Sequence, residues 1–160
     1  MKRISLTVMS FTLLALSSFS HMKENGKIYI THPNIDAVVA SNEAYLHKDA
    51  AANMQHFSDT AKVWMSGMEK PIGIKEAMPM FMSDHDKYDS IKLTPYGYPD
   101  YLEYDKDNAK VVQSWWTWSG KSKKTGELVK IPVVQFDFFD NAGKITFEGI
   151  YGDFSKMKKD

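Results

Sequence analysis

Three runs of strand-forming residues follow one another in the second half of the chain, with short polar turns between them. The runs cover residues 110–120, 128–139 and 144–154, and each is dense in β-branched and aromatic residues. Gly126 lies in the first turn, and Asp140-Asn-Ala-Gly143 forms the second, with the residue types that tight turns require. The pattern predicts an antiparallel meander.

The first half of the chain carries helical patterns. Apolar residues share one face of a segment that begins at Pro33, and Asp49 is placed to cap a second short helix over residues 50–57. A strand, a third helix and two extended pieces are expected after them, at residues 61–65, 73–85, 91–98 and 101–104. Pro79 lies inside the third helical pattern, where it should bend the helix or mark its start. The order of helices first and sheet last is typical of an α+β fold.

The N-terminus has the pattern of a secretory signal peptide. Lys2-Arg3 precedes an apolar stretch from Ile4 to Leu16, and small serine residues suitable for cleavage follow at positions 17, 18 and 20. A membrane anchor is the alternative, but it needs a longer and less interrupted apolar stretch. We therefore expect residues 1–20 to be a signal peptide and residues 21–160 to be a single domain. This domain would be exported to the periplasm or secreted, with no membrane attachment after the signal is removed.

Composition excludes several kinds of site. The chain has no cysteine, so an exported domain would rely on its apolar core without disulfides. Its formal net charge of +0 gives no basis for nucleic-acid binding. Arg3 is the only arginine, so the mature chain cannot hold a carboxylate or phosphate with a guanidinium group. The histidines show no ligand spacing, and we expect neither a metal nor another cofactor.

Three short motifs occur along these predicted elements. They are Phe57-Ser-Asp59-x-Ala61-x-Val63, Gly73-x-x-Glu76-Ala77 and Phe139-Asp140-x-x-Gly143-Lys-Ile145. In this order, over residues 34–154, the chain resembles the nuclear transport factor 2-like superfamily in its SnoaL-like branch. The resemblance implies an α+β cone, in which N-terminal helices pack on a strongly curved, mostly antiparallel sheet. It also implies an apolar pocket at the open end, and homodimers through the outer face of the sheet.

The resemblance can be tested residue by residue against activities known in the superfamily. Where a steroid isomerase would have its base, its tyrosine and its acid, this chain has Met65, Ser41 and Gln135. The arginine-centred site of an epoxide hydrolase is excluded because the mature chain has no arginine. Neither known catalytic set is therefore matched.

Polar residues of the last hairpin are the leading candidates for chemistry. If residues 140–143 close a two-residue loop, Gln135 opposes Glu148 and Asp137 opposes Thr146. The resemblance places this polar face in the pocket, where apolar surroundings would raise the pKa of Glu148 and Asp137 and suit them to acid–base catalysis. The hydrophobic pattern alone would instead turn the polar face to water and the aromatic face to the core. A dimer that covers the aromatic face would reconcile the two interpretations.

Tryptophans are the candidates for ligand binding. In Trp115-Trp-Thr-Trp118, strand alternation puts Trp116 and Trp118 on one face, and Trp64 lies on an earlier strand. Indole rings offer flat apolar walls for a small apolar or aromatic molecule, although large aromatic residues in strands are also ordinary core residues.

His85 is a further catalytic candidate. It stands between Asp84 and Asp86 at the end of the third predicted helix, and a histidine flanked by acids can act as an oriented base. The alternatives are a place at the pocket rim or an exposed helix end.

Three functions follow from these residues. The first is a module that binds a small apolar or aromatic molecule with Trp64, Trp116, Trp118 and Gln135. The second is a cofactor-free lyase, cyclase or isomerase in which Glu148, Asp137 or His85 moves a proton. The third is a protein-interaction domain that uses its aromatic outer face.

Overall fold

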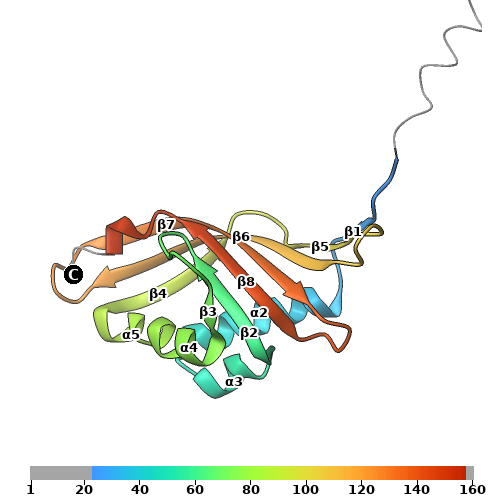
Figure 1. Ribbon diagram of the computed structural model, residues 1–160. Coiled ribbons are helices and arrows are strands. Elements are labelled where there is room, and N and C mark those ends of the chain that lie inside the picture. Colours follow the sequence, from blue (N-terminus) through green and yellow to red (C-terminus); the bar gives the residue numbers. More distant parts are fainter. Residues whose placement is uncertain (1–22, 158–160) are drawn as a thin grey trace, which may run out of the picture.

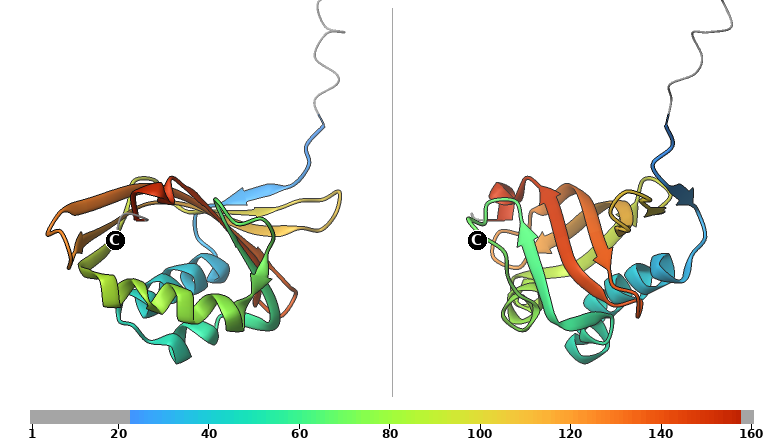
Figure 2. Two further views of the ribbon diagram at one scale, coloured as in Figure 1. Left: turned by 60° about the vertical axis from the view of Figure 1, so that its left-hand side comes forward. Right: turned by 45° about the vertical axis from the view of Figure 1, so that its right-hand side comes forward.

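Helices and a strongly curved sheet form two layers (Figures 1 and 2). The computed structural model describes residues 23–157, and the expected signal peptide lies outside the described residues. The sheet has eight strands, and helices cover its concave face. This arrangement confirms the expected α+β cone with a mostly antiparallel sheet. In chain order, the elements are β1 (Lys27–Tyr29), α2 (Pro33–Leu46), α3 (Ala50–Met54), β2 (Phe57–Met65), β3 (Ile72–Gly73), α4 (Ile74–Met82), α5 (Asp84–Lys87), β4 (Tyr88–Pro95), β5 (Asp100–Glu103), β6 (Lys110–Ser122), β7 (Leu128–Phe139), β8 (Ile145–Gly152) and the short 3-10 helix η2 (Phe154–Met157).

The C-terminal meander is the centre of the sheet. The strand order of the whole sheet is β1-β5-β6-β7-β8-β2-β3, and β4 also pairs with β6. Strands β6, β7 and β8 are antiparallel neighbours, as the sequence predicted. Strand β2 comes from the first half of the chain and pairs with β8 in parallel, with Val63 opposite Glu148. The long strands therefore form a continuous curved wall around the helices (Figure 2).

Side-chain caps begin the first two helices. His32 precedes α2, and its Nδ1 accepts a hydrogen bond from the Asn34 N–H at 3.1 Å, while Pro33 supplies the fixed φ that suits the first helical position. Asp49 caps α3 as predicted, because its carboxylate accepts from the Ala52 N–H at 2.9 Å. Helix α3 ends at Met54, earlier than the sequence pattern indicated. None of the helices in the described part of the chain is both long and apolar enough to span a membrane.

The third predicted helix is divided in two. Helix α4 runs from Ile74 to Met82 with Pro79 inside it, so Pro79 does not mark its start. After Ser83 the separate short helix α5 begins at Asp84. Asp84, the first residue of α5, lies in the wall of a cavity described below.

The core lies between the concave face of the sheet and the helices. Val38 of α2, Ala77 of α4, Val63 of β2 and Ile131 of β7 are completely buried in it. Ile145 of β8 is also completely buried, although strict alternation along the strand would put it on the outer face with Phe147. The pairing shifts register between Phe138 and Phe139, and this irregularity turns Ile145 inward.

The turn of the last hairpin differs from the predicted two-residue loop. The Asp140 N–H donates to the Lys144 carbonyl at 3.0 Å, and the Asp140 carboxylate accepts from the N–H groups of Ala142 and Lys144 at 2.9 Å. Gly143 adopts a φ of 74°, a left-handed conformation that favours glycine. The turn therefore has three residues between Asp140 and Lys144.

The longer turn and the irregularity between Phe138 and Phe139 each move the register of the hairpin by one residue, which makes a shift of two in total. Asp137 faces Glu148, and Gln135 faces Ile150, so both predicted pairs were wrong. A shift of two preserves the face on which each side chain lies, because side chains alternate with a period of two. Gln135, Asp137 and Glu148 consequently still share one face. All three are buried, which decides between the two open interpretations of that face.

Candidate functional site

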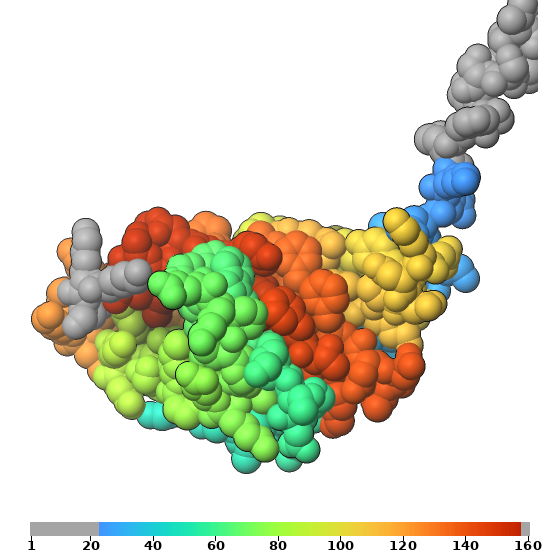
Figure 3. Space-filling model, viewed as in Figure 1, coloured from blue at the N-terminus to red at the C-terminus, as the bar shows by residue number. Residues whose placement is uncertain are grey.

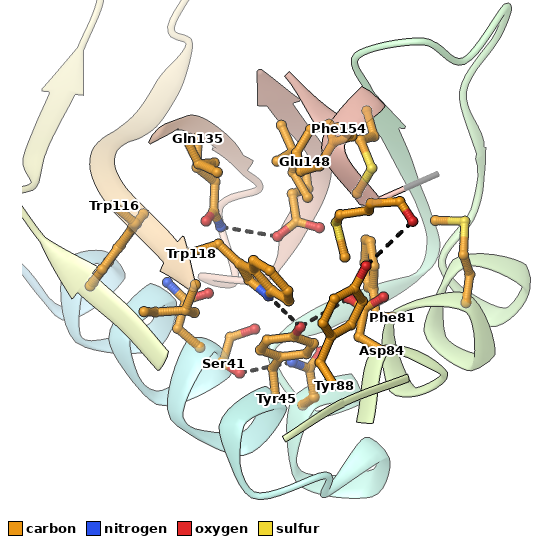
Figure 4. A pocket seen from close by; sticks show the side chains of 18 of the residues that line it. Ser41, Tyr45, Phe81, Asp84, Tyr88, Trp116, Trp118, Gln135, Glu148 and Phe154 are labelled. Carbon is orange, nitrogen blue, oxygen red and sulfur yellow. Dashed lines mark hydrogen bonds between the residues drawn. The ribbon is translucent and has the colours of Figure 1, made fainter. Parts of the chain in front are cut away.

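A cavity of about 310 Å³ lies between the concave face of the sheet and the helices (Figure 4). Aromatic rings form much of its wall. They come from Trp116 and Trp118 of β6, Phe81 of α4, Tyr88 of β4 and Phe154 of η2. The cavity is therefore built from segments that are far apart in the sequence, and its surface is largely apolar.

Gln135 and Glu148 bring polar groups to the sheet side of this cavity (Figure 4). The Gln135 Nε2 donates to Glu148 Oε1 at 3.0 Å and to Asp137 Oδ2 at 2.9 Å. Asp137 is completely buried and is not part of the cavity wall. One amide thus holds two carboxyl groups, of which only that of Glu148 can touch a molecule in the cavity.

Burial keeps this carboxyl pair from ionising fully. Removal from water raises the pKa of both Asp137 and Glu148, and the charge of Asp137 raises the pKa of Glu148 further. Within residues 23–157, no lysine or histidine forms an ion pair with either carboxyl group. Asp137 Oδ1 also has no hydrogen-bond partner, which disfavours a charge on that group. The pair therefore retains a proton at pH values where ordinary carboxyl groups have lost theirs.

A second polar chain lies on the helix side of the cavity. The Tyr45 hydroxyl donates to Asp84 Oδ2 at 3.0 Å and accepts from the Trp118 Nε1–H at 2.8 Å (Figure 4). Burial and the neighbouring Asp84 raise the pKa of Tyr45, so it remains a neutral phenol. Burial also raises the pKa of Asp84. These contacts fix the Trp118 ring in the cavity wall.

The structure brings four of the predicted site residues together and separates three from them. Trp116, Trp118, Gln135 and Glu148 all line the cavity. Asp137 lies behind Gln135, as described above, and Trp64 and His85 are elsewhere.

Trp64 is on the outer side of the sheet. Its neighbour Val63 is completely buried, so strand alternation turns Trp64 away from the cavity. Its ring lies 5.1 Å from that of Tyr151, and its Nε1–H donates to the Met68 carbonyl at 3.0 Å. The predicted contact between Trp64 and a ligand in the pocket is therefore not supported by its position.

His85 is used to hold two elements together. Its Nε2–H donates to the backbone carbonyl of Tyr45 at 2.8 Å, and the two rings pack edge to face at 5.3 Å. A carbonyl can only accept, so this bond places the proton on Nε2. His85 is not in the cavity wall, whereas its neighbour Asp84 is.

Tyr45 and Asp84 are polar cavity residues that the sequence interpretation missed, as are Asn42, Asn53 and Lys87. The superfamily's tyrosine position was matched to Ser41, which lies one helical turn before Tyr45 on the same face of α2. Both Ser41 and Tyr45 line the cavity. Their i, i+4 spacing was the signal that could have identified Tyr45.

Metal-ligating side chains do not gather at this site. Over residues 23–157, no group of three or more histidine, aspartate or glutamate side chains is arranged to hold a metal ion. The polar groups of the cavity wall include carboxyl, hydroxyl and amide groups and the ammonium group of Lys87.

Comparisons with known proteins identify the fold. No protein-family model matches the chain, and no curated protein has a significantly similar sequence. Solved structures do match. IdmH of Streptomyces antibioticus, provisionally assigned as a polyketide cyclase, has a TM-score of 0.65 at 12% identity, over 80% of this chain and 97% of its own.

Two further structures support the same conclusion. An NTF2-like protein from Burkholderia thailandensis has a TM-score of 0.60 at 18% identity, over 79% of this chain and 95% of its own. A protein from Shewanella denitrificans, provisionally assigned as a SnoaL-like polyketide cyclase, has a TM-score of 0.57 at 12% identity, over 81% of this chain and 96% of its own.

The carboxyl pair predicts an unusual dependence of stability on pH. Because the pKa of Asp137 and Glu148 is raised in the folded state, that state binds more protons than the unfolded chain once the pH exceeds the ordinary value near 4. The free energy of unfolding should then fall as the pH rises, by about 1.4 kcal/mol per pH unit for each extra proton bound.

Urea unfolding between about pH 5 and pH 8 should show a shallower fall for Asp137→Asn than for the wild type, because one titrating group is removed. The exposed Glu69→Gln variant is the control and should follow the wild-type curve. A slope that is the same in Asp137→Asn and the wild type would contradict this account of the pair.

Proposed function

Because the chain has the nuclear transport factor 2-like fold, which SnoaL-like proteins share, we propose that it binds a small, largely apolar or aromatic molecule in its cavity. The observation that carries the proposal is the wall itself, in which Trp116 and Trp118 stand beside Gln135 and Glu148. Ligand sites in proteins combine mostly apolar walls with a few oriented polar groups, in cavities of about 300 Å³ or more. The assignments of IdmH and the Shewanella protein as polyketide cyclases also support a small-molecule ligand.

A second function is favoured by the carboxyl pair. We propose that the protein is a cofactor-free lyase, cyclase or isomerase in which Glu148 transfers a proton. In the form of the pair that is protonated on Asp137 and ionised on Glu148, the Glu148 carboxylate is a base in an apolar wall, and its raised pKa strengthens it. It can remove a proton from a carbon beside a carbonyl group and return it to the same or another carbon. Asp137 acts as a positioning residue, because it does not reach the cavity.

The outer face of the sheet supports a homodimer. Rings of Phe136 and Tyr151 lie 5.6 Å apart, and those of Phe138 and Phe147 lie 5.8 Å apart, on the face away from the cavity. Phe138 is 37% exposed and Tyr151 is 47% exposed. Since apolar surface of this kind is stabilised by a partner, we propose that two copies of the chain associate through it. The same face would serve the third function, a protein-interaction domain.

Export is also part of the proposal. Its support is the pattern of residues 1–20, a basic start followed by a short apolar stretch and small residues. The domain would then work in the periplasm or outside the cell.

Native mass spectrometry of the protein purified gently from its own source tests assembly, export and ligand together. We expect a species of two chains that each begin near His21 and together carry a discrete additional mass. That mass, released and identified, would give the class of ligand. A bare single chain would contradict the dimer, and a chain that still begins at Met1 would contradict export.

Tryptophan variants test where a ligand binds. Acetylnaphthalene, a flat aromatic ketone, is a suitable probe for equilibrium dialysis. Trp116→Ala should weaken its binding about tenfold or more, which corresponds to about 1.4 kcal/mol, because a wall of the cavity is lost. Trp64→Ala is the matched control and should bind like the wild type, since Trp64 lies outside the cavity. An equal loss of affinity in both variants would indicate that the probe binds outside the cavity.

Exchange of the methyl protons of acetylnaphthalene for deuterium, followed by NMR, tests the proposed catalysis. In Glu148→Gln the rate should fall by about 10²- to 10⁴-fold, because the base is removed, while dialysis should show that the probe is still bound. The Trp64→Ala protein should exchange these protons at the wild-type rate. Two results would contradict the enzymatic function and leave the binding function in place. One is a wild-type exchange rate no faster than that in buffer alone, and the other is an equal rate in the wild type and Glu148→Gln.

A further inference from the structure

Asn53 of α3 has an unused hydrogen-bond acceptor at the cavity wall. The residue lines the cavity and is only 6% exposed, and within residues 23–157 no group donates to its Oδ1. Its Nδ2 donates to the backbone carbonyl of Ser41 at 2.8 Å. A carbonyl can only accept, so the amide cannot be turned over without losing this bond. The orientation is therefore fixed, and Oδ1 must be the atom left free.

Asn42 of α2 presents the complementary group. It also lines the cavity, and its buried Nδ2 finds no acceptor in the part of the chain that the structure describes. The helix side of the cavity thus offers a free acceptor on Asn53 and a free donor on Asn42. On the sheet side, Gln135 is different, because its amide already donates to two carboxyl groups.

These unused groups lie across the cavity from the carboxyl pair. Ser41, to which Asn53 is hydrogen-bonded, stands opposite Gln135 and Glu148 (Figure 4). Buried polar groups in folded proteins nearly always have partners, and one that lacks a partner is a reason to look for a ligand that supplies it. An entirely apolar ligand would leave the Asn53 Oδ1 without a partner, which is unfavourable.

We propose that the helix side of the cavity is a hydrogen-bonding subsite for a hydroxylated ligand. Asn53 Oδ1 accepts from a ligand hydroxyl, and Asn42 Nδ2 donates to a ligand oxygen. A neutral hydroxyl suits Asn53 because the amide oxygen carries no charge to balance an ammonium group. The inference rests on the proposed binding function, and it narrows the ligand to a mostly apolar molecule with a hydroxyl directed at the helices.

Three forms of one probe test the subsite. Acetylnaphthalene is compared with two derivatives that carry a hydroxyl or a methoxy group on the far ring. A methoxy oxygen can accept a hydrogen bond but cannot donate one to Asn53. The wild type should bind the hydroxyl form about tenfold or more tightly than the methoxy form, since a site built for a hydroxyl discriminates strongly against its loss.

Substitutions then assign this preference to the helix side. Asn53→Leu, of similar volume, should bring the ratio of the two affinities to about one. Asn42→Ala should weaken both oxygen-bearing derivatives relative to acetylnaphthalene itself, and it removes no hydrogen bond made by Nδ2 within the protein. Trp64→Ala, outside the cavity, should keep the wild-type ratio.

A measurement on the wild type covers the case in which Asn53→Leu does not fold, because that substitution also removes the bond to Ser41. The side-chain amide NMR signals of Asn53 should shift with the hydroxyl probe and not with the methoxy probe. Equal affinities in the wild type, a preference that survives in Asn53→Leu, or an unchanged Asn53 signal would overturn the subsite. The cavity proposal would still stand if all probes bind and lose affinity in Trp116→Ala. If no probe binds to the wild type, both proposals fall.

Discussion

The side-chain amide of Gln135 holds the carboxyl groups of Asp137 and Glu148 together in the protein interior. Within the described residues no cation balances them, so the pair is compatible with folding only if it keeps a proton. The observed orientation of the β7–β8 hairpin, with both carboxyl groups buried, therefore requires this retained proton. Its polar face turns to the cavity, and the aromatic face is left on the outer side of the sheet. Polar chemistry inside and apolar surface outside are therefore two results of one orientation.

Local features of the fold could be predicted because the sequence determines them locally. Alternation and turn residues identified β6, β7 and β8, and the Asp49 side chain identified the start of α3. The hairpin register could not be predicted in the same way. It depends on the Asp140 carboxylate, which accepts two backbone hydrogen bonds and so adds a residue to the turn, and on the irregularity between Phe138 and Phe139. Whether these hydrogen bonds form depends on the geometry of the turn, and its residue types fit a two-residue and a three-residue turn equally well.

The sequence did not predict the site correctly where tertiary packing determines which side chains reach the cavity. Alternation correctly put Trp116 and Trp118 on one face, but whether Trp64 joins them depends on how β2 meets β8. His85 stands between two acidic residues, as a catalytic histidine could, yet its side chain hydrogen-bonds to the backbone of α2. Tyr45 was missed since its partners, Asp84 and Trp118, are distant in sequence. The hydrophobic pattern also favoured the wrong face of the last hairpin, because a cavity can bury polar groups that an ordinary core would exclude.

The parallel pairing of β2 with β8 has a consequence for how the chain reaches this structure. Val63 pairs with Glu148, which comes much later in the sequence, so β2 has one open edge until β8 has been made. The long segment between the two strands must also lose conformational entropy before the pairing can stabilise the fold, which slows folding. During synthesis the helices can form early, but the sheet that encloses the core is completed last. A nascent chain would therefore remain without an enclosed core until β8 has been synthesised.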